Sequence, residues 1–550
     1  MLKRISIFDK SKVLGCGMPY DVYATDIYSM ANIASEEIPA LQISFADWLR
    51  EQDQATLQDL NLDDKEISDS EVYNRRALGQ YLCAQYKLLT NNLRAAGFII
   101  NEYSATEIVD IAQQGDSVKL KDVEGNDYST DYLFIATGHA FPNDDKPEFG
   151  YYGSPWPIRK ILPSSGKYFD FNMGTLGASL SAFDVISSLF HRHGTFTEQG
   201  DKLVYTAHNG AENFKITLHD ANGWLPHLQY EQKEPMRALY RHVDRQTLLS
   251  LLDKQGHLRL AVYFDKVCRP ALGQAFREDF KPDMIAKLQD PTFTLMDFVE
   301  AMSVRHSYDD PFSGMQQELP AAKNSVENDR PIHWKEVTDD LMYTLNYHAE
   351  LMPAEDHITF NDIVMPFLMN VIAALPLSSA KIMLALHAAG KLDLKAGNID
   401  DISFENNKTI VRFTDPSGNK KECHYPVFVS CGGQSALEID DYPFTSLVKD
   451  GSVQAARVKF SKPVDEKQPF YFLKGIDVDP GYRVYAKDGQ ANNHIRDVSS
   501  LGKSESKPEA ANNHIRDVSF THTLGLRPYS YGLQACNQTA KLGVESLVMS

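Results

Sequence analysis

Residues 4–39 read RISIFDKSKVLGCGMPYDVYATDIYSMANIASEEIP. Residues 4–8, in which Ile5, Ile7 and Phe8 are apolar, predict a short β-strand, which ends on the acidic residue Asp9. Gly15 and Gly17 follow and predict a tight turn. In a dinucleotide-binding fold, a strand that ends on an acid lies beneath an adenosine ribose, and its carboxylate accepts both ribose hydroxyls. We therefore expect Asp9 to bind a ribose.

A strand of this kind is normally the second of its sheet, and a first strand, a glycine turn and a helix come before it. Only Met1, Leu2 and Lys3 precede the strand here. About thirty residues, one strand–turn–helix unit, would supply the preceding part. We expect either that the fold begins elsewhere or that the chain lacks its first βα unit. In the second case dinucleotide affinity should be poor, because the amide cradle at the helix N-terminus is lost.

Length and composition are typical of a soluble protein with several domains. The chain has 550 residues, of which 43% are hydrophobic and 23% charged, and about 150 residues per domain suggests three or four domains. The net charge of -19 argues against nucleic acid and anionic membrane as default partners, because both select basic patches. Six irregularly spaced cysteines and a charged start without a signal peptide predict a reduced, cytoplasmic protein.

Residue periodicity predicts an α/β protein with a helical middle region. The strand–turn–helix pattern occurs again at residues 168–190, and its next strand ends at Asp220. A hairpin around residues 209–210 would be an insertion in that unit. The other expected elements are helices within residues 40–100, strands within 117–135, mostly helices within 235–400 with a polar, mobile-looking segment near 307–329, strands within 402–431, and a helix from about Gly532.

Five sequence blocks follow one another in a characteristic order: GMPY at residues 17–20, ANIAS at 31–35, NRRALGQYL at 74–82, ATGH at 136–139 and GASLSAFD at 177–184. With them the chain resembles the two-dinucleotide-binding flavoproteins known as FAD/NAD(P)-binding proteins, which are distantly similar to N-hydroxylating flavin monooxygenases and glutathione-reductase-like enzymes. The GMPY and ANIAS blocks are the specific part, since the ATG block is common among flavoproteins.

The resemblance implies an α/β fold: a Rossmann-like FAD-binding domain, here without its first βα unit, an inserted NAD(P)-binding-like domain and a helical region. The expected boundaries are residues 1–160 for the N-terminal part of the FAD-binding domain, 161–235 for the NAD(P)-binding-like domain, 236–400 for the helical region and 401–550 for the return to the FAD-binding domain.

The resemblance also implies the cofactors FAD and NAD or NADP. An FAD needs backbone amides at its pyrophosphate, a carboxylate at its ribose and a close backbone approach to its ring system. Glycines permit such an approach. Arg76 either balances phosphate charge or is a solvated residue at a helix start. The predicted cofactor-binding residues are Asp9, Gly15, Gly17, Met18, Pro19, Tyr20, Asn32, Arg76, Thr137, Gly138, Gly177, Ser179 and Asp220.

The second dinucleotide turn leaves alternatives open. Ser179 and Ala182 replace two of the three expected glycines, so the turn is either a nicotinamide site or a structural strand-to-helix turn. If it binds a cofactor, Asp220 lies where a partner of the ribose 2′-hydroxyl belongs. No arginine follows that would match a 2′-phosphate, so we expect NAD in preference to NADP, or neither. Cys431 is expected to be structural, and the histidine spacing predicts no metal site.

Two functions remain open from the sequence. The first is an FAD-dependent, possibly monooxygenase-like oxidoreductase, in which hydride passes from the nicotinamide to the flavin and the flavin reduces oxygen or another acceptor. Its substrate would be an unidentified small molecule, and no residue identifies itself as a catalytic acid or base. The oligomeric state cannot be inferred.

The alternative is a degenerate, non-catalytic protein that keeps the fold as a binding or scaffold protein. The missing first unit and the altered second turn favour it. A perfect repeat also favours the non-catalytic alternative. The nonapeptide ANNHIRDVS occurs at residues 491–499 and again at 511–519, within a duplicated segment that spans 491–519. The Ser/Lys/Glu-rich linker between the copies predicts a surface loop. We expect only one copy to be part of the fold.

Overall fold

The computed structural model describes residues 3–548, except positions 40, 65, 140, 142–143, 201, 304–309, 373, 434–435, 463–467 and 488–510. The first copy of the repeat therefore lies outside the described residues. The second copy forms strand β20 (Ala511–Asp517). Its apolar and charged side chains alike are buried, since Ile515, Arg516 and Asp517 each have 0% of their surface exposed.

The N-terminal region is built around helix α3 (Arg75–Ala95). Strand β1 (Arg4–Phe8) pairs in parallel with β2 (Ile99–Tyr103), which follows α3, so β1 and β2 flank a βαβ-type crossover. An antiparallel sheet of β3 (Ile108–Gln114), β4 (Ser117–Asp122) and β5 (Asp127–Thr130) comes next. The short helices α1 (Phe45–Arg50) and α2 (Gln54–Asp59) precede α3.

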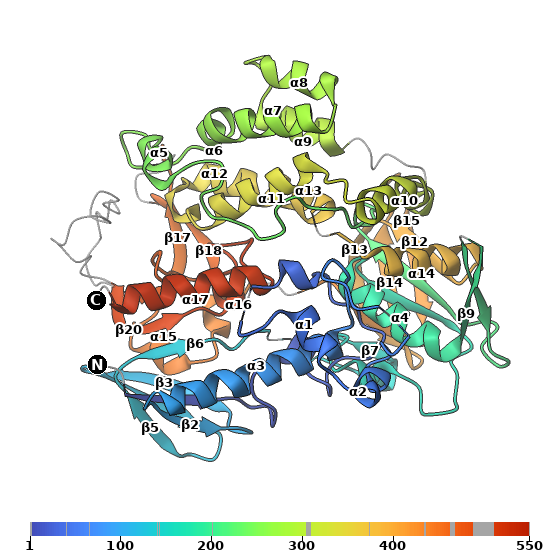
Figure 1. The fold of residues 1–550 in the computed structure, drawn as a ribbon, viewed down its shortest axis with the longest axis horizontal. Helices are drawn as coiled ribbons and strands as arrows, with labels where there is room; N and C mark the ends of the chain where they lie inside the picture. Colours follow the sequence, from blue (N-terminus) through green and yellow to red (C-terminus); the bar gives the residue numbers. More distant parts are fainter. Residues whose placement is uncertain are drawn as a thin grey trace.

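The C-terminal part of the chain returns to this N-terminal region. Strand β6 (Leu133–Ile135), which leads into the ATGH block, pairs in parallel with β20, and β20 pairs with β19 (Arg483–Tyr485). Helix α17 (Leu533–Val548) lies beside these strands, as the red and blue segments show in Figure 1. The remaining C-terminal elements are α15 (Thr445–Lys449), β17 (Ala455–Lys459), β18 (Phe470–Ile476) and α16 (Phe520–Thr523).

A parallel sheet forms the second nucleotide-binding-like unit. In the described residues its five strands lie in the order β12 (Leu392–Ala396), β11 (Lys215–Asp220), β8 (Asn172–Leu176), β16 (Phe428–Ser430) and β7 (Tyr151–Tyr152), and every pair is parallel. The chain runs from the central strand β8 to one side first and later to the other. This is the topological switch point at which α/β sheets bind ligands.

The expected strand–turn–helix pattern is present at the centre of this sheet. Strand β8 leads into helix α4 (Leu180–His193), and β11 ends on Asp220 as predicted. The predicted position of the hairpin was wrong. The hairpin consists of β9 (Gly194–Gln199) and β10 (Lys202–Ala207), and residues 209–210 lie in the connection from β10 to β11.

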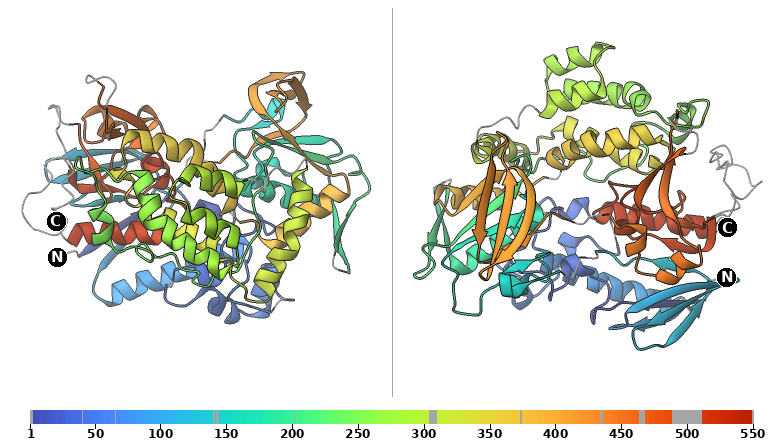
Figure 2. Two further views of the ribbon diagram at one scale, coloured as in Figure 1. Left: turned by 90° about the horizontal axis from the view of Figure 1, so that it is seen from above. Right: turned by 180° about the vertical axis from the view of Figure 1, so that it is seen from behind.

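An antiparallel sheet covers part of the parallel one. Its strands are β13 (Asn398–Glu405), β14 (Lys408–Thr414) and β15 (Lys420–Tyr425). Val411 and Tyr425 of this sheet pack on Phe428 of β16 in one buried cluster. In Figure 2 the antiparallel sheet is the orange one beside the teal and green strands. Helix α14 (Leu377–Ala388) packs with α4 in the core of the parallel sheet.

The helical region forms the layer at the top of Figure 1 and has its own apolar core. Its α-helices are α5 (Arg245–Ser250), α6 (Leu260–Tyr263), α7 (Arg269–Glu278), α8 (Pro282–Gln289), α9 (Leu295–Ser303), α11 (His333–Asn346), α12 (Ala354–Thr359) and α13 (Met365–Val371). Helix α10 (Pro311–Glu327) lies between α9 and α11 in the sequence but packs beside α14 (Figure 1).

The prediction of a polar, mobile-looking segment near residues 307–329 was wrong, because α10 occupies most of it. Asp310 caps this helix by accepting hydrogen bonds from the amides of Phe312 and Ser313 at 3.1 Å each. Phe312 and Met315 are buried against the core of the parallel sheet. The polar residues of α10 thus lie opposite an apolar stripe that the sequence also contains.

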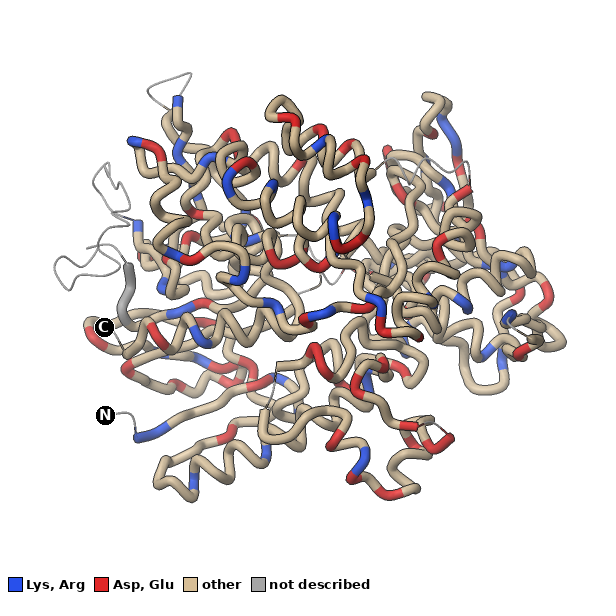
Figure 3. Tube along the Cα trace, turned by 45° about the horizontal axis from the view of Figure 1, so that its top comes forward, with Lys and Arg blue, Asp and Glu red and all other residues tan. Residues whose placement is uncertain are grey.

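Acidic and basic residues are interspersed along the chain in Figure 3. Among the helices that the structure describes, none is long and apolar enough to cross a membrane. A search of the same residues finds no group of three or more His, Cys, Asp and Glu side chains arranged to hold a metal ion.

Candidate functional site

The GMPY segment packs tightly on one face of α3. Gly79 of α3 lies under the carbonyl oxygen of Tyr20, and a Cβ at position 79 would collide with that oxygen. Gly15 has φ 99°, and a Cβ at position 15 would collide with the side chain of Tyr86. Residues 79 and 86 are two turns apart on the same face of the helix. The two glycines therefore allow residues 15–20 to run along α3 in the opposite chain direction.

The turn itself has the conformation that its sequence indicates. Gly17 has φ 74° and precedes a short 3-10 helix at Met18–Tyr20, where Pro19 fits the first turn. Met18, Pro19 and Tyr20 are half-buried, and Asn32 in the following segment is exposed. Gly138 of the ATGH block has φ 70°, and open space surrounds the position of a Cβ there. A ligand can therefore approach the backbone closely at Gly138.

Asp9 has one carboxylate oxygen free. Its Oδ1 accepts a hydrogen bond from the amide of Ser11 at 2.7 Å, while Oδ2 has no hydrogen-bond partner in the described part of the chain. Asp9 is half-buried at the end of β1. Burial and Glu102 raise the pKa of the Tyr86 phenol, and the nearby charge of Asp9 adds to that shift. The Ser11 amide fixes the carboxylate and leaves Oδ2 available to a ribose hydroxyl.

Arg75 holds the N-terminal region against the second nucleotide-binding-like unit. Its Nη2 lies 2.9 Å from Oδ2 of Asp184 in α4, with 14% and 6% of the two side chains exposed. Its Nε donates to the carbonyl oxygen of Met30 at 3.1 Å, and its guanidinium lies 5.7 Å from the ring centre of Trp156. Burial raises the pKa of Asp184 to about 6, against the opposing effect of Arg75.

Arg75 also faces the ATGH block. Burial lowers the pKa of His139 to about 4, and the charge of Arg75 adds to that shift. Sequence reasoning selected Arg76 and missed Arg75. The adjacent arginines at the start of α3 were the signal, but nothing in the sequence distinguishes the one that forms the ion pair.

Arg76 is the arginine that remains available to a ligand. Its side chain makes no ion pair and no hydrogen bond with the described residues, and its Nε is buried without a partner. A buried guanidinium nitrogen without a partner costs free energy that an anionic group would recover. The residue present at this position thus fits a phosphate group.

The ATGH crossing is fixed by residues from the far end of the chain. The amide of Thr137 donates to Oγ of Ser519 at 3.0 Å, and the hydroxyl of Thr521 donates to the carbonyl oxygen of Gly138 at 2.9 Å. The buried carboxylate of Asp517 accepts from the amide of Ser519 at 3.0 Å. His522 supports the same network.

The Nδ1 of His522 lies 2.7 Å from Asp517 Oδ2, and the Tyr442 hydroxyl donates to that oxygen at 2.8 Å. Sequence reasoning missed Asp517 and Ser519 as parts of the site. Both belong to the second copy of the repeated nonapeptide.

Glu37, two residues after the ANIAS block, is a titratable group that the sequence did not single out. Its Oε2 accepts from the amide of Ala34 at 2.9 Å, and Gln232 donates to its Oε1. Burial raises the pKa of Glu37 to about 7, with Arg237 acting in the opposite direction. This carboxyl group therefore exchanges a proton near neutral pH, where the N-terminal segment meets the residues that precede α5.

The second turn lies at the carboxyl edge of the parallel sheet. The amide of Gly177 donates to the carbonyl oxygen of His219 at 2.7 Å. Gly177 has φ 95°, and a Cβ there would lie 2.8 Å from the carbonyl oxygen of Cys431. This glycine thus permits close packing of three strand ends. Ser179 precedes α4 and makes no side-chain capping hydrogen bond, so its hydroxyl leaves the first amides of the helix uncapped.

Asp220 lies beside this turn, at the end of the neighbouring strand. Its Oδ1 accepts from the amides of Asn222 and Trp224 at 3.0 and 3.1 Å. Within the described chain, Oδ2 has no hydrogen-bond partner. The glycine turn, the helix N-terminus and the fixed acid have the arrangement of a dinucleotide site at a switch point.

The predicted residues thus form two groups. Residues 9, 15–20 and 76 lie along or beside α3, with Thr137 and Gly138 at the adjoining crossing, and Gly177, Ser179 and Asp220 lie on the parallel sheet. The Arg75–Asp184 ion pair connects the two groups.

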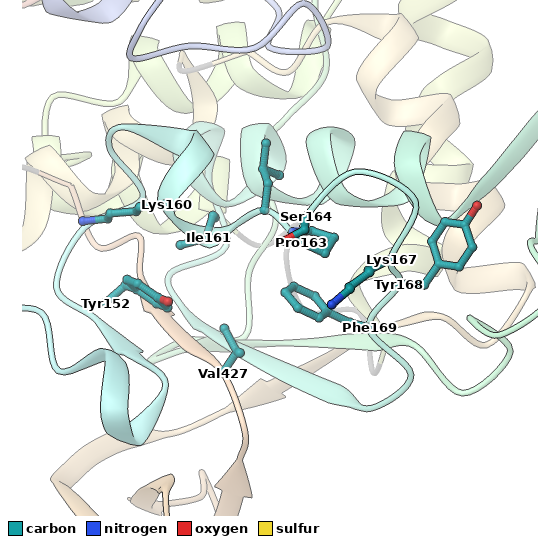
Figure 4. A pocket seen from close by; sticks show the side chains of 10 residues that line it. Tyr152, Lys160, Ile161, Pro163, Ser164, Lys167, Tyr168, Phe169 and Val427 are labelled. Carbon is teal, nitrogen blue, oxygen red and sulfur yellow. The ribbon is translucent and has the colours of Figure 1, made fainter.

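A separate cavity of about 320 Å³ contains none of the predicted residues. Tyr152, Lys160, Phe169 and Val427 are among the side chains that line it (Figure 4). Lys160 is engaged in an ion pair with Asp145 at 2.8 Å.

Comparisons with known proteins identify two regions of the chain. Residues 2–140 match the family model described as FAD-NAD(P)-binding, and residues 246–372 match the YdhS-like middle domain. The uncharacterized protein YdhS of Escherichia coli K12 is 26% identical over 446 residues, which cover 80% of each chain. The predicted resemblance to FAD/NAD(P)-binding flavoproteins is confirmed for the N-terminal region, and so are the predicted cofactor classes, FAD and a nicotinamide dinucleotide.

Solved structures similar to the chain include two ornithine hydroxylases. The reduced enzyme PvdA from Pseudomonas aeruginosa has a TM-score of 0.46 at 9% identity, covering 98% of this chain and 90% of that chain. The ornithine N-hydroxylase KtzI from Kutzneria sp. 744 has a TM-score of 0.43 at 12% identity, covering 98% and 91%. At these TM-scores the similarities carry no argument about activity.

The packing of the GMPY segment on α3 predicts that Gly79→Ala destabilises the protein. The new methyl group has to displace the Tyr20 backbone, which costs about 1–3 kcal/mol. The matched control is Gly273→Ala in α7, where a Cβ meets nothing within 4 Å and helix propensity favours alanine by up to about 1 kcal/mol. Urea denaturation of both variants checks the prediction, and equal stabilities would contradict it.

The two arginines at the start of α3 should differ in their contribution to stability. Arg75→Ala leaves the buried Asp184 without its partner and is expected to cost about 3–5 kcal/mol. Arg76→Ala removes no ion pair or side-chain hydrogen bond to the described residues and is expected to change the stability by less than about 0.5 kcal/mol. Denaturant midpoints distinguish the two, and an Arg76→Ala variant as unstable as Arg75→Ala would refute this assignment.

Proposed function

We propose that the chain is an FAD-dependent oxidoreductase that takes its electrons from a nicotinamide dinucleotide and acts on a small molecule, with monooxygenase-like reactions within its range. The observation that carries the proposal is the Arg75–Asp184 ion pair. It joins a region that matches the FAD-NAD(P)-binding family to the carboxyl edge of a parallel sheet. Two dinucleotide sites on either side of this pair are the arrangement that electron transfer between two cofactors requires.

In this proposal residues 1–160 and 401–550 form the FAD-binding domain, residues 161–235 contribute the nicotinamide site and residues 236–400 form a helical region toward the substrate. Oδ2 of Asp9 binds the FAD ribose, and Arg76 binds a phosphate group. Gly17 and Gly138 allow a close backbone approach, with the Ser519 and Asp517 network holding the ATGH crossing in place. These assignments rest on the free atoms and open positions described above.

At the second site, the uncapped amides of α4 favour the negative charge of a pyrophosphate. Oδ2 of Asp220 accepts a ribose 2′-hydroxyl and repels a 2′-phosphate, so the proposed donor is NADH in preference to NADPH. When bound, the flavin and the nicotinamide supply hydride transfer and the reduction of oxygen or another acceptor. The chain's own contribution is to hold the cofactors and, at Glu37, to keep a carboxyl group that exchanges a proton near neutral pH.

The flavin part of the proposal is tested by a visible absorbance spectrum of the purified chain, with and without added FAD. The expected result is the absorbance of bound flavin, and Asp9→Asn and Arg76→Ala should each weaken FAD binding about tenfold, equivalent to about 1.4 kcal/mol. The control is Asp116→Asn, because Asp116 is exposed in the turn between β3 and β4. A protein that stays colourless at high FAD concentration would contradict the proposal and favour the non-catalytic alternative.

The nicotinamide part predicts that NADH reduces the flavin-loaded protein faster than NADPH under anaerobic conditions. Asp220→Asn keeps an oxygen for the amides of Asn222 and Trp224 but removes the charge, so the preference for NADH should fall about tenfold. The matched control is Asp393→Asn, at an exposed position of the adjacent strand β12. If FAD binds but neither nicotinamide reduces it, the second turn is a structural strand-to-helix turn.

A further inference from the structure

Two cysteines meet where the GMPY segment runs along α3. Cys16 lies between Gly15 and Gly17, and Cys83 lies on the face of α3 that carries Gly79 and Tyr86. The thiols of Cys16 and Cys83 lie near enough to each other that each shifts the pKa of the other. This contact is in register with the others, because Tyr20 meets Gly79 one helical turn away and Gly15 meets Tyr86 on the other side.

The close approach of the backbone keeps the two sulfur atoms together. Gly15 and Gly79 leave no room for a Cβ, so the segment cannot move toward α3, and it is anchored to the helix on both sides of Cys16. Cys16 is buried, with 7% of its surface exposed, whereas Cys83 is half-buried. Cys83 is therefore the more accessible of the two residues to a small oxidant.

The surroundings also favour the thiolate form of Cys83 over that of Cys16. Interaction with the Cys16 thiol lowers the pKa of Cys83 to about 7, with the charge of Lys87 acting in the same direction and burial and Asp21 acting against it. Interaction with Cys83 and burial raise the pKa of Cys16. Lys87 lies four residues after Cys83 and thus on the same side of the helix.

The other cysteines differ in ways that make them useful controls. Cys268 and Cys431 are buried, and burial raises the pKa of both thiols. Cys536 is exposed at the start of α17. Cys423 is half-buried in β15.

We propose that Cys16 and Cys83 are a dithiol pair that a hydroperoxide oxidises reversibly to an intramolecular disulfide. In the first step the Cys83 thiolate attacks a peroxide oxygen, the O–O bond breaks, and Cys83 becomes a sulfenic acid while hydroxide takes up a proton and leaves as water. In the second step the Cys16 thiol attacks the sulfenic sulfur, the S–S bond forms and a second water leaves. A dithiol reductant restores both thiols by exchange.

The cross-link would join the segment that carries GMPY to the helix that carries Arg75 and Arg76. The disulfide needs neither FAD nor NAD, so this proposal stands independently of the proposed function. Oxidation would fix by a covalent bond the distance between Gly17 and α3, which in the reduced protein is set by the packing of Gly15 on Tyr86 and of Tyr20 on Gly79.

The experiment uses the full-length protein, reduced, freed of reductant and then treated with an equimolar amount of hydrogen peroxide at neutral pH. Remaining thiols are blocked under denaturing conditions, and non-reducing peptide mapping by mass spectrometry identifies the linked residues. The expected result is one cross-linked peptide pair containing Cys16 and Cys83, with the loss of two hydrogen atoms, and its disappearance after treatment with dithiothreitol. Cys536→Ser should leave this result unchanged.

Variants of Cys16 separate a reactive pair from mere proximity. In Cys16→Ala, Cys83 should stop at the sulfenic acid, which dimedone traps, and alkylation of Cys83 by iodoacetamide at neutral pH should slow several-fold because the Cys16 thiol no longer lowers the pKa of Cys83. Cys16→Ser keeps a hydroxyl donor, so it should retain rapid alkylation without forming the disulfide. The proposal is overturned if Cys16 and Cys83 both remain free thiols while Cys536 is oxidised, or if Cys16→Ala leaves the product at Cys83 unchanged.

Discussion

The ion pair between Arg75 and Asp184 is the constraint on which the arrangement of the two nucleotide-binding-like units depends. Both side chains are buried, and removing two charges from water is costly unless they compensate each other. Arg75 is the first residue of α3, and Asp184 lies in the second turn of α4. The ion pair can therefore form only when these two parts of α3 and α4 are close together. The carbonyl oxygen of Met30 adds a hydrogen bond that also places the end of the GMPY-to-ANIAS segment. One guanidinium thus fixes three parts of the chain at once.

Close backbone contact is the second principle of the site. Gly15 and Gly79 are required because a side chain would occupy the space of Tyr86 or of the Tyr20 carbonyl, whereas Gly138 is next to open space. The same residue type therefore has two different roles. At positions 15 and 79 glycine permits protein–protein packing, and at position 138 it leaves a surface that a ligand can approach. The dihedral angle alone, positive at both Gly15 and Gly138, does not distinguish these roles.

The sequence predicted the local units well and the contacts between them poorly. The unit β8–α4–β11 and the start of α17 were predicted because a periodicity change and a glycine mark each boundary within a few residues. Helix α10 was missed because its polar residues obscured an apolar stripe that became evident only against the parallel sheet. Arg75 could not be distinguished from Arg76, because their difference depends on Asp184, which lies more than 100 positions away along the chain. The hydrogen bond from Thr137 to Ser519 spans 382 positions, so no local pattern could have predicted it.

The pairing of β6 with β20 has a consequence for the order in which the protein can fold during synthesis. Strand β6 is made early, but its parallel partner comes from the last tenth of the chain. Until that strand leaves the ribosome, one edge of β6 remains unpaired, and the ATGH crossing lacks Ser519 and Thr521. Exposed strand edges promote aggregation, and such non-local pairings form slowly. The N-terminal region is therefore completed last, after the units that lie between the two strands in the sequence have already formed.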